Sequence, residues 1–171
     1  MTSVKAIYNL GAKELGVTNP NPFTGIFIPD NGTVIERLPV PLNVIRTIQD
    51  ECFEIDDDNR WLIAMIADTG MRLSEAVGLL VDDIKLDATT PHITLQKHPW
   101  RPLKTASSQR DIPLIGSALR AAESVVGQGN RFAFPRYCSE FKCNANSASA
   151  ALNKWLKQRL PEGCVIHSFR H

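Results

Sequence analysis

The 171-residue sequence lacks several features that define large classes of protein. It contains no apolar run of membrane-spanning length and does not open on a signal peptide, so we expect a cytoplasmic protein with no membrane partner. The motifs GxxxxGK, GxGxxG and GxSxG do not occur in it. Their absence argues against P-loop nucleotide hydrolysis, Rossmann-type dinucleotide binding and α/β-hydrolase chemistry. No pair of carboxylates with catalytic spacing stands out either.

The cysteines are few and give no clear metal signature. Cys52, Cys138, Cys143 and Cys164 form no CxxC pair. In a cytosolic chain of this size we expect them to remain thiols. Cys138 and Cys143 resemble half of a zinc site, but no matching second half exists, so a structural zinc ion is not favoured.

The net charge of +1 hides a strong asymmetry along the chain. Residues 1–90 carry 7 Lys plus Arg against 14 Asp plus Glu, a net of −7, whereas residues 91–171 carry 12 against 4, a net of +8. Such a distribution is typical of a second half that faces a polyanion. It is equally compatible with two halves that pair with each other in the fold.

Hydrophobic periodicity predicts a mostly helical chain with a small sheet. Helical spacing is found over 4–15, 42–53, 61–69, 73–80, 116–126 and 147–160, and a last helix is expected to start near Ser168. The inward residues should be Leu119, Ala122 and Val126 in one helix and Leu152, Trp155, Leu156 and Leu160 in another. The runs IKLD, HITLQ and RDIPL read as short strands, with the turn-rich segment HPWRPLKTASSQR between the last two. The Asn-, Pro- and Gly-rich residues 16–41 read as a linker.

Residues 69–79, TGMRLSEAVGL, place an arginine at a break between two helices. Asp56 to Asp58 suit the start of the first of these helices, and Gly70 suits its end. Glu75 follows Arg72 by about one helical turn, on the same face. The pair is either an exposed ion pair of little consequence or an arginine that a carboxylate holds rigid toward a phosphate.

Two further segments gather basic groups. In PLKTASSQRDIPL, Lys104 lies between Arg101 and Arg110, which indicates either a solvated edge hairpin or a lysine that reaches nucleic acid. In VIHSFRH, His167 and Arg170 are three residues apart and share a helical face. The spacing to His171 also permits zinc on Cys164, His167 and His171, but no acidic ligand accompanies them.

The words ADTGMRLSEAVGLLVDDI, LKTASSQRDIPL and HSFRH occur in this order over residues 40–171, and together they resemble the tyrosine recombinases, the phage integrase family. The resemblance implies an α+β fold, a mostly helical catalytic domain with a three-stranded antiparallel sheet. It implies Arg72, Lys104, His167 and Arg170 as catalytic residues, with Lys97 as a weaker candidate for the lysine, and Glu75 and His171 as active-site support. From the location of the hairpin, we expect Arg101, Thr105 and Arg110 to contact DNA.

The same resemblance implies a function and a domain plan. The expected partner is double-stranded DNA, cleaved and rejoined through a 3′-phosphotyrosyl intermediate without a cofactor, by a homotetramer on DNA. A cytoplasmic, nucleoid-associated enzyme of bacterial or phage origin fits this activity. Residues 1–40 would be the end of an upstream DNA-binding domain and its linker, and residues 41–171 the catalytic domain.

The sequence departs from the family in its nucleophile. Family members carry the attacking tyrosine after His-x-x-Arg, but Tyr8 and Tyr137 both precede His167. We therefore expect a catalytic domain truncated before its nucleophile, inactive on its own. A noncatalytic DNA-binding relative, a type IB topoisomerase-like enzyme and a zinc-binding regulatory protein remain the alternatives.

Overall fold

The computed structural model describes residues 2–26 and 38–170 of a chain that divides into two compact units, Met1–Ile35 and Glu36–His171. In the first unit, α1 (Thr2–Leu15) confirms the helix expected over 4–15. The side chain of Asn21 donates to Lys5 O at 3.2 Å and Asn9 Oδ1 at 2.7 Å, which holds the following segment against this helix. Much of the expected linker, residues 27–37, lies outside the described residues.

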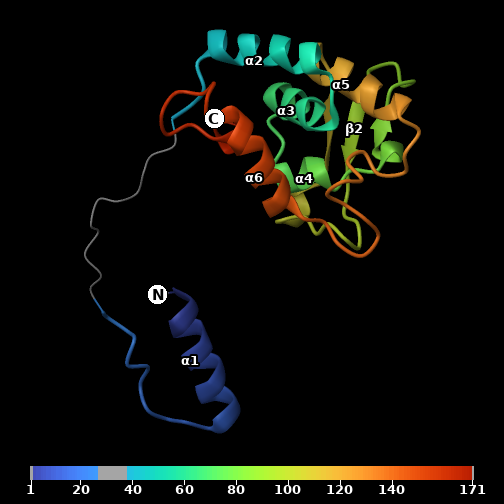
Figure 1. The fold of residues 1–171 in the computed structure, drawn as a ribbon. Helices are drawn as coiled ribbons and strands as arrows, with labels where there is room; N and C mark the ends of the chain where they lie inside the picture. Colours follow the sequence, from blue (N-terminus) through green and yellow to red (C-terminus); the bar gives the residue numbers. More distant parts are fainter. Residues whose placement is uncertain (1, 27–37, 171) are drawn as a thin grey trace. The chain divides into compact units, whose positions relative to one another are not determined.

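The second unit has the α+β architecture predicted from the sequence (Figure 1). Its helices are α2 (Leu42–Ile55), α3 (Asp58–Thr69), α4 (Leu73–Val77), α5 (Gly116–Gly127) and α6 (Ala145–Leu156). Short 3-10 turns lie at η1 (Val81–Asp83), η2 (Ala106–Ser108) and η3 (Ile166–Arg170). The strands β1 (Ile84–Lys85), β2 (His92–Leu95) and β3 (Arg110–Pro113) form an antiparallel sheet in the order β1-β2-β3.

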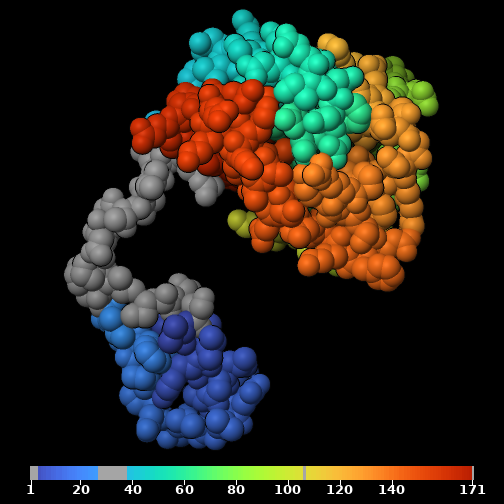
Figure 2. All heavy atoms as spheres, in the orientation of Figure 1, coloured from blue at the N-terminus to red at the C-terminus, as the bar shows by residue number. Residues whose placement is uncertain are grey.

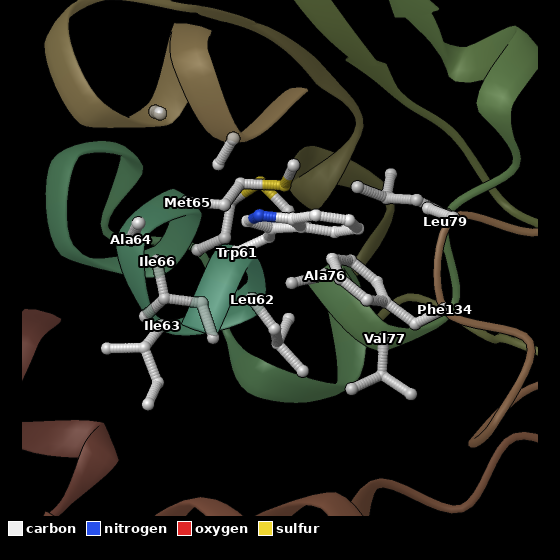
Figure 3. Packing of buried hydrophobic residues seen from close by; sticks show 14 of the residues in the cluster. Trp61, Leu62, Ile63, Ala64, Met65, Ile66, Ala76, Val77, Leu79 and Phe134 are labelled. Carbon is white, nitrogen blue, oxygen red and sulfur yellow. The ribbon is translucent and has the colours of Figure 1, made fainter. Parts of the chain in front are cut away.

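Helix α3 lies at the centre of the second unit. Its residues Trp61–Ile66 are all buried, so the middle of the helix is apolar on every side and is enclosed by other elements. It packs against α2, α4, α5, α6 and η3. Figure 3 shows its buried side chains together with those of α4 and Phe134. As the sequence predicted, Asp57 caps its start by accepting a hydrogen bond from Arg60 N, and Gly70 ends it with φ 59°.

Helix α5 faces the core with small residues. The buried side chains are Ala118, Ala121, Ala122 and Val125. The predicted inward positions Leu119 and Val126 are only half-buried. Alanines let α5 approach α3 closely, which places the larger side chains at the edge of the contact. The predicted inward position Ala122 is therefore confirmed, whereas at the other two positions the neighbouring residues Ala118 and Val125 are the buried ones.

Two helices end earlier than the apolar pattern predicted. Helix α4 stops at Val77, since Leu79 O accepts from Ala133 N at 3.0 Å and Leu80 forms a bridge with Phe132. Helix α6 stops at Leu156 with only Leu152 and Leu156 of the predicted face fully buried. Trp155 instead lies half-buried under the guanidinium groups of Arg60 and Arg159.

The C-terminal segment lies against the helical core. Arg159 Nε donates to Glu51 Oε2 at 2.6 Å, which joins the end of α6 to α2. Figure 2 shows this segment, in red, beside the cyan atoms of α2. The turn η3 then packs on α3, with Ile166 and Phe169 buried. These contacts fix where the residues of HSFR project.

Candidate active site

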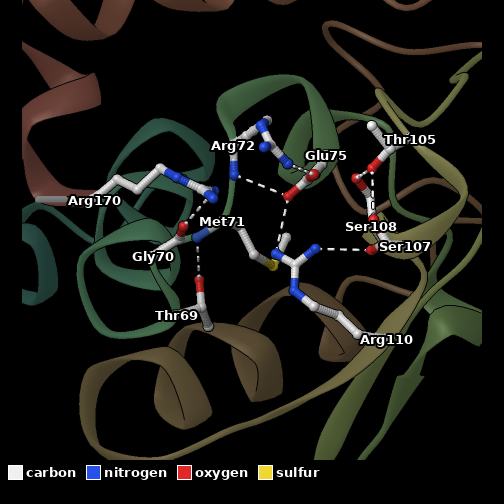
Figure 4. A network of polar contacts seen from close by, with 10 residues as sticks. All are labelled: Thr69, Gly70, Met71, Arg72, Glu75, Thr105, Ser107, Ser108, Arg110 and Arg170. Carbon is white, nitrogen blue, oxygen red and sulfur yellow. Dashed lines mark hydrogen bonds and ion pairs between the residues drawn. The ribbon is translucent and has the colours of Figure 1, made fainter.

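The loop Gly70–Arg72 between α3 and α4 is the centre of the candidate site (Figure 4). Gly70 adopts the left-handed conformation that ends α3, and Met71 is buried below the loop. Arg72 becomes the N-cap of α4 with an extended backbone. The arginine is therefore held at a rigid junction between two helices.

Glu75 is a buried carboxylate that orients Arg72. It is 3% exposed and accepts hydrogen bonds from Arg72 N at 3.0 Å and Arg72 Nη1 at 2.8 Å. Burial alone would raise the pKa of Glu75, but the hydrogen bonds from Arg72 and Arg110 outweigh it and hold the pKa below its ordinary value. The ion pair is therefore partly buried and specifically aligned, not a loose surface contact.

Arg110 brings a second guanidinium group to the same carboxylate. Its Nη2 donates to Glu75 Oε2 at 3.2 Å, and its Nη1 donates to Ser108 O at 2.8 Å. The side chains of Arg72 and Arg110 remain 31% and 34% exposed, so both keep a solvent-facing edge. The sequence pointed to Arg110 as a DNA contact but gave no sign of its pairing with Glu75, because the two are 35 residues apart.

Arg170 reaches the same loop from the far end of the sequence. Its Nη1 donates to Gly70 O at 3.0 Å across a separation of 100 residues, while the side chain stays exposed. Figure 4 shows Arg170 and Arg110 approaching Arg72 and Glu75 from different sides. Two guanidinium groups thus contact one carboxylate and a third contacts the adjoining loop, which leaves local positive charge available to an anion.

Turn η3 also carries His167, which is half-buried. Residues three apart are eclipsed in a 3-10 helix, so His167 and Arg170 project on the same side. The turn is fixed by Ile166 N, which donates to Asn153 Oδ1 at 2.8 Å. His171 lies outside the described residues, so its supporting role and its role as a zinc ligand stay predictions.

The residues predicted to lie on the hairpin before β3 divide into exposed and buried positions. Lys97, Lys104 and Thr105 are exposed. The Thr105 hydroxyl lies 3.0 Å from both Ser107 Oγ and Ser108 Oγ, and Ser108 O accepts from Arg110. Lys104 thus stands on a loop that hydrogen bonds connect to the arginine cluster.

Arg101 contradicts the prediction that it contacts DNA. It is 2% exposed, its Nη2 donates to Gln96 O at 2.8 Å, and it lies 3.7 Å from Asp83 Oδ2. Its Nε and Nη1 have no hydrogen-bond partner among the described residues. A guanidinium enclosed in this way cannot reach a phosphate, because it would have to leave the interior and expose the space that it fills.

Asp83 and its partners form a buried network that the sequence did not reveal. Asp83 is 1% exposed and accepts from Leu80 N at 3.0 Å and Gln96 Nε2 at 3.0 Å. His98 Nε2 lies 2.8 Å from Asp83 Oδ2, and Trp100 stacks on His98.

A Cβ on Gly78 would meet Arg101 Cδ at 2.4 Å, so glycine is required there. The network ties the hairpin that bears Lys104 to the end of α4.

The described tyrosines do not supply a nucleophile to the cluster. Tyr137 is 6% exposed, its Oη donates to Asn59 Oδ1 at 2.5 Å, and burial raises its pKa. Tyr8 belongs to the first unit, where it contacts Phe23. Within residues 2–26 and 38–170, no group of three His, Cys, Asp or Glu side chains is arranged to hold a metal ion, and no helix is long and apolar enough to cross a membrane.

Glu75→Gln is expected to lower the free energy of unfolding at neutral pH by about 1.5–3 kcal/mol, because charged donors lose their anionic acceptor. The folded-state pKa of Glu75 is lowered from 4.5, so its contribution is complete above that value and is lost as the pH falls through the folded pKa. Urea unfolding at neutral and acid pH measures this difference, which should shrink only on the acid side. Glu123→Gln, at an exposed position of α5, is the matched control, and an equal difference at every pH would contradict the account.

A helical domain with a three-stranded sheet presents arginine side chains at one loop beside a buried acid, and this class of site is suited to binding an anion such as phosphate. The model of the phage integrase family matches residues 41–171, and the chain belongs to that family. It is 25% identical over 171 residues to the tyrosine recombinase XerC of Psychromonas ingrahamii, with 92% of this chain and 52% of that protein covered. It therefore spans about half the length of that relative.

Solved structures share the fold. The integrase of transposon Tn1549, in complex with transposon right end DNA, matches with a TM-score of 0.62 and 19% identity over 99% of this chain and 62% of that one. XerA recombinase matches with a TM-score of 0.59 and 14% identity over 96% of this chain and 55% of that one. At these identities the likeness establishes the architecture, and the roles of individual residues rest on the geometry above.

Proposed function

We propose that the second unit is the phosphate-binding part of a site-specific DNA recombinase, which cleaves and rejoins DNA strands through a 3′-phosphotyrosyl intermediate. The observation that carries the proposal is the hydrogen bond from Arg170 Nη1 to Gly70 O at 3.0 Å. It brings an arginine from the C-terminal turn to the loop that ends at Arg72. Membership in the phage integrase family and the recombinase fold support the same reaction.

In this proposal, Arg72 and Arg170 stabilise the nonbridging oxygens of the scissile phosphate. Negative charge accumulates on these oxygens during phosphoryl transfer, and guanidinium groups fixed before the reaction need no reorganisation to meet it. Glu75 keeps the fork of Arg72 aligned, since it accepts from both its backbone and its side chain. Arg110 adds charge at the same acid and, with Thr105, is proposed to contact the DNA backbone.

Lys104 and His167 are proposed to move protons. A tyrosine oxygen attacks phosphorus, the bond to the 5′ oxygen breaks, and Lys104 protonates the departing oxygen. His167 is proposed to move a proton near the attacking tyrosine oxygen. The reverse reaction restores the DNA bond from the phosphotyrosine, so no nucleotide hydrolysis is required. The attacking residue is neither Tyr8 nor Tyr137, and His171 is proposed only as support.

The wider setting is proposed on the family resemblance. Residues 1–40 are the end of an upstream DNA-binding domain with its linker, and residues 41–171 belong to the catalytic domain. The enzyme acts as a tetramer on double-stranded DNA, in the cytoplasm and associated with the nucleoid. The diagnostic product of the reaction is a covalent adduct between protein and a nicked duplex.

Phosphate binding is expected to appear as a steep salt dependence of DNA affinity. Each neutralised phosphate contributes about −0.9 to the slope of log K against log salt concentration. Arg72→Ala and Arg170→Ala should each weaken affinity for any duplex and reduce the magnitude of the slope by about 1. Fluorescence anisotropy with a labelled duplex across a salt series measures both quantities.

Arg46→Ala is the control, because it removes the same charge from an exposed position on α2, outside the cluster. Its slope should equal that of the parent. Slopes that fall equally in all three variants would mean that DNA responds to net charge alone. Slopes that stay unchanged in Arg72→Ala and Arg170→Ala would remove these residues from the phosphate contact.

A further inference from the structure

We propose that Cys138 and Cys143 are the two halves of a reversible disulfide, which makes the turn between them a redox-sensitive site. The proposal does not depend on the DNA chemistry above. It rests on backbone geometry and on the different surroundings of the two thiols. All four cysteines of the chain are free thiols in the structure.

The backbone around the pair already has the geometry of a cross-strand disulfide. Cys138 and Cys143 face each other in an isolated antiparallel bridge. The flanking hydrogen bonds run from Ser139 N to Lys142 O at 2.9 Å and from Asn144 N to Tyr137 O at 2.8 Å. This pattern marks a non-hydrogen-bonded pair, whose Cα atoms are about 4.5 Å apart. Disulfides span Cα separations of about 4.4–6.8 Å, so a pair of this type lies within the range that the bond can bridge.

The two thiols influence each other's ionisation and differ in exposure. The Cys138 thiol donates to Ser139 O at 3.9 Å, and each thiol shifts the pKa of the other. Cys138 is 3% exposed, whereas Cys143 is half-buried. The other two cysteines have different surroundings, since Cys52 is enclosed in α2 and Cys164 donates to Leu38 O at 3.5 Å. The pair on the turn is therefore the natural dithiol of this chain.

The surroundings assign an order of reaction to the two sulfurs. Burial, together with the interaction with Cys143, raises the pKa of Cys138 to about 12. Burial also raises the pKa of Cys143, but the hydrogen bond from Cys138 and the Arg101 guanidinium act in the opposite direction. Cys143 is thus the more solvent-accessible sulfur and the one whose thiolate these two interactions favour, so it reacts first in its ionised form.

Hydrogen peroxide is the oxidant in the proposed reaction. The Cys143 thiolate attacks one peroxide oxygen, the O–O bond breaks, and hydroxide leaves. Cys143 is then a sulfenic acid. The Cys138 sulfur then attacks the Cys143 sulfur, the S–O bond breaks, and water leaves as the disulfide forms. Two thiols and one peroxide thus give one disulfide and two waters. A small dithiol reverses the reaction by exchange, and its own two thiols become the disulfide.

The bond would reinforce the entry to α6. It closes the segment 138–143, and Asn144 directly after it caps the helix by accepting from Ser147 N at 3.1 Å. Cross-linking a short segment removes freedom from the unfolded chain. We expect the midpoint of thermal unfolding of the second unit to rise by about 4–8 °C on oxidation.

Peptide mapping tests the proposal directly, because Lys142 lies between the two cysteines. The full chain is treated with peroxide, its remaining thiols are blocked, and it is digested with trypsin without reduction. Residues 137–142 and 143–154 should be recovered as one cross-linked species, and two of the four thiols should be consumed. Dithiothreitol should separate the peptides and restore all four thiols.

Cys143→Ser and Cys138→Ser should each abolish the linkage and the thermal shift, whereas Cys164→Ser should change neither. Circular dichroism of each variant shows whether the fold is kept, and Cys143→Ser tests the idea even where the more buried Cys138 variant fails to fold. Four titratable thiols after peroxide treatment would overturn the proposal. A linkage through Cys52 or Cys164, or between two chains, would overturn it equally.

Discussion

Replacing Asp83 by alanine will lower the free energy of unfolding of the second unit by about 3–5 kcal/mol, since it strands a buried charge. Asp83 is 1% exposed, and the Arg101 guanidinium 3.7 Å away is 2% exposed. The variant would also remove the acceptor of Gln96 and the Asp83 contact of His98. Urea unfolding followed by circular dichroism gives the free energy.

Asp82→Ala is the matched control. The carboxylate of Asp82 is exposed, so its loss should change the free energy of unfolding by no more than about 0.5 kcal/mol. Adding Arg101→Met to Asp83→Ala should recover part of the loss, since an apolar side chain no longer needs a counterion. A single Asp83 variant within about 1 kcal/mol of the parent would show that the pair does not hold the hairpin in place.

The elements of the second unit were predictable wherever local chemistry decides them. Asp57 and Gly70 cap α3 as the sequence indicated, and the alternating runs became β2 and β3. The predictions failed where a segment far away in the sequence forms hydrogen bonds with the residues in question. Helix α4 ends early because Leu79 and Leu80 bond to residues 132–133, and nothing in LSEAVGLL signals that partner. The buried face of α5 differs from the predicted one at Leu119 and Val126. Close packing against α3 favours small residues such as alanine, whereas hydrophobic periodicity gives more weight to large ones.

The candidate site divides in the same way. The Arg72–Glu75 pair follows from a spacing of three residues, and the structure confirms the contact. The contact of Arg170 with Gly70 spans 100 residues, so only a family resemblance pointed to it. Arg101 was misassigned because a basic residue on a hairpin looks solvent-exposed in sequence. Its partners are the buried carboxylate of Asp83 in η1 and the backbone oxygen of Gln96, and neither carries a mark of this pairing in the sequence.

Arg72→Ala and Arg170→Ala are each expected to slow strand cleavage by about 10²–10³-fold, the usual loss when one fixed donor to a developing negative charge is removed. The assay traps a covalent adduct on a nicked duplex. Because Tyr8 belongs to the first unit and Tyr137 is buried, the assay supplies the attacking tyrosine by fusing residues 1–171 to the tyrosine-bearing segment of a related recombinase. Arg72→Lys should recover only part of the rate, since lysine lacks the planar fork that pairs with both Glu75 and a phosphate oxygen.

The loss of cleavage rate in the arginine variants should exceed the loss that weaker DNA binding alone would cause. This difference separates an effect on catalysis from an effect on DNA affinity. At saturating DNA the rate of adduct formation isolates the chemical step, where a donor that acts on transition-state charge lowers the rate itself. Arg46→Ala should retain the parental rate, because its exposed position on α2 lies outside the Gly70–Arg72 loop. Adduct formation within about tenfold of the parent in either arginine variant would mean that the guanidinium groups gathered at this loop bind DNA without performing the chemistry.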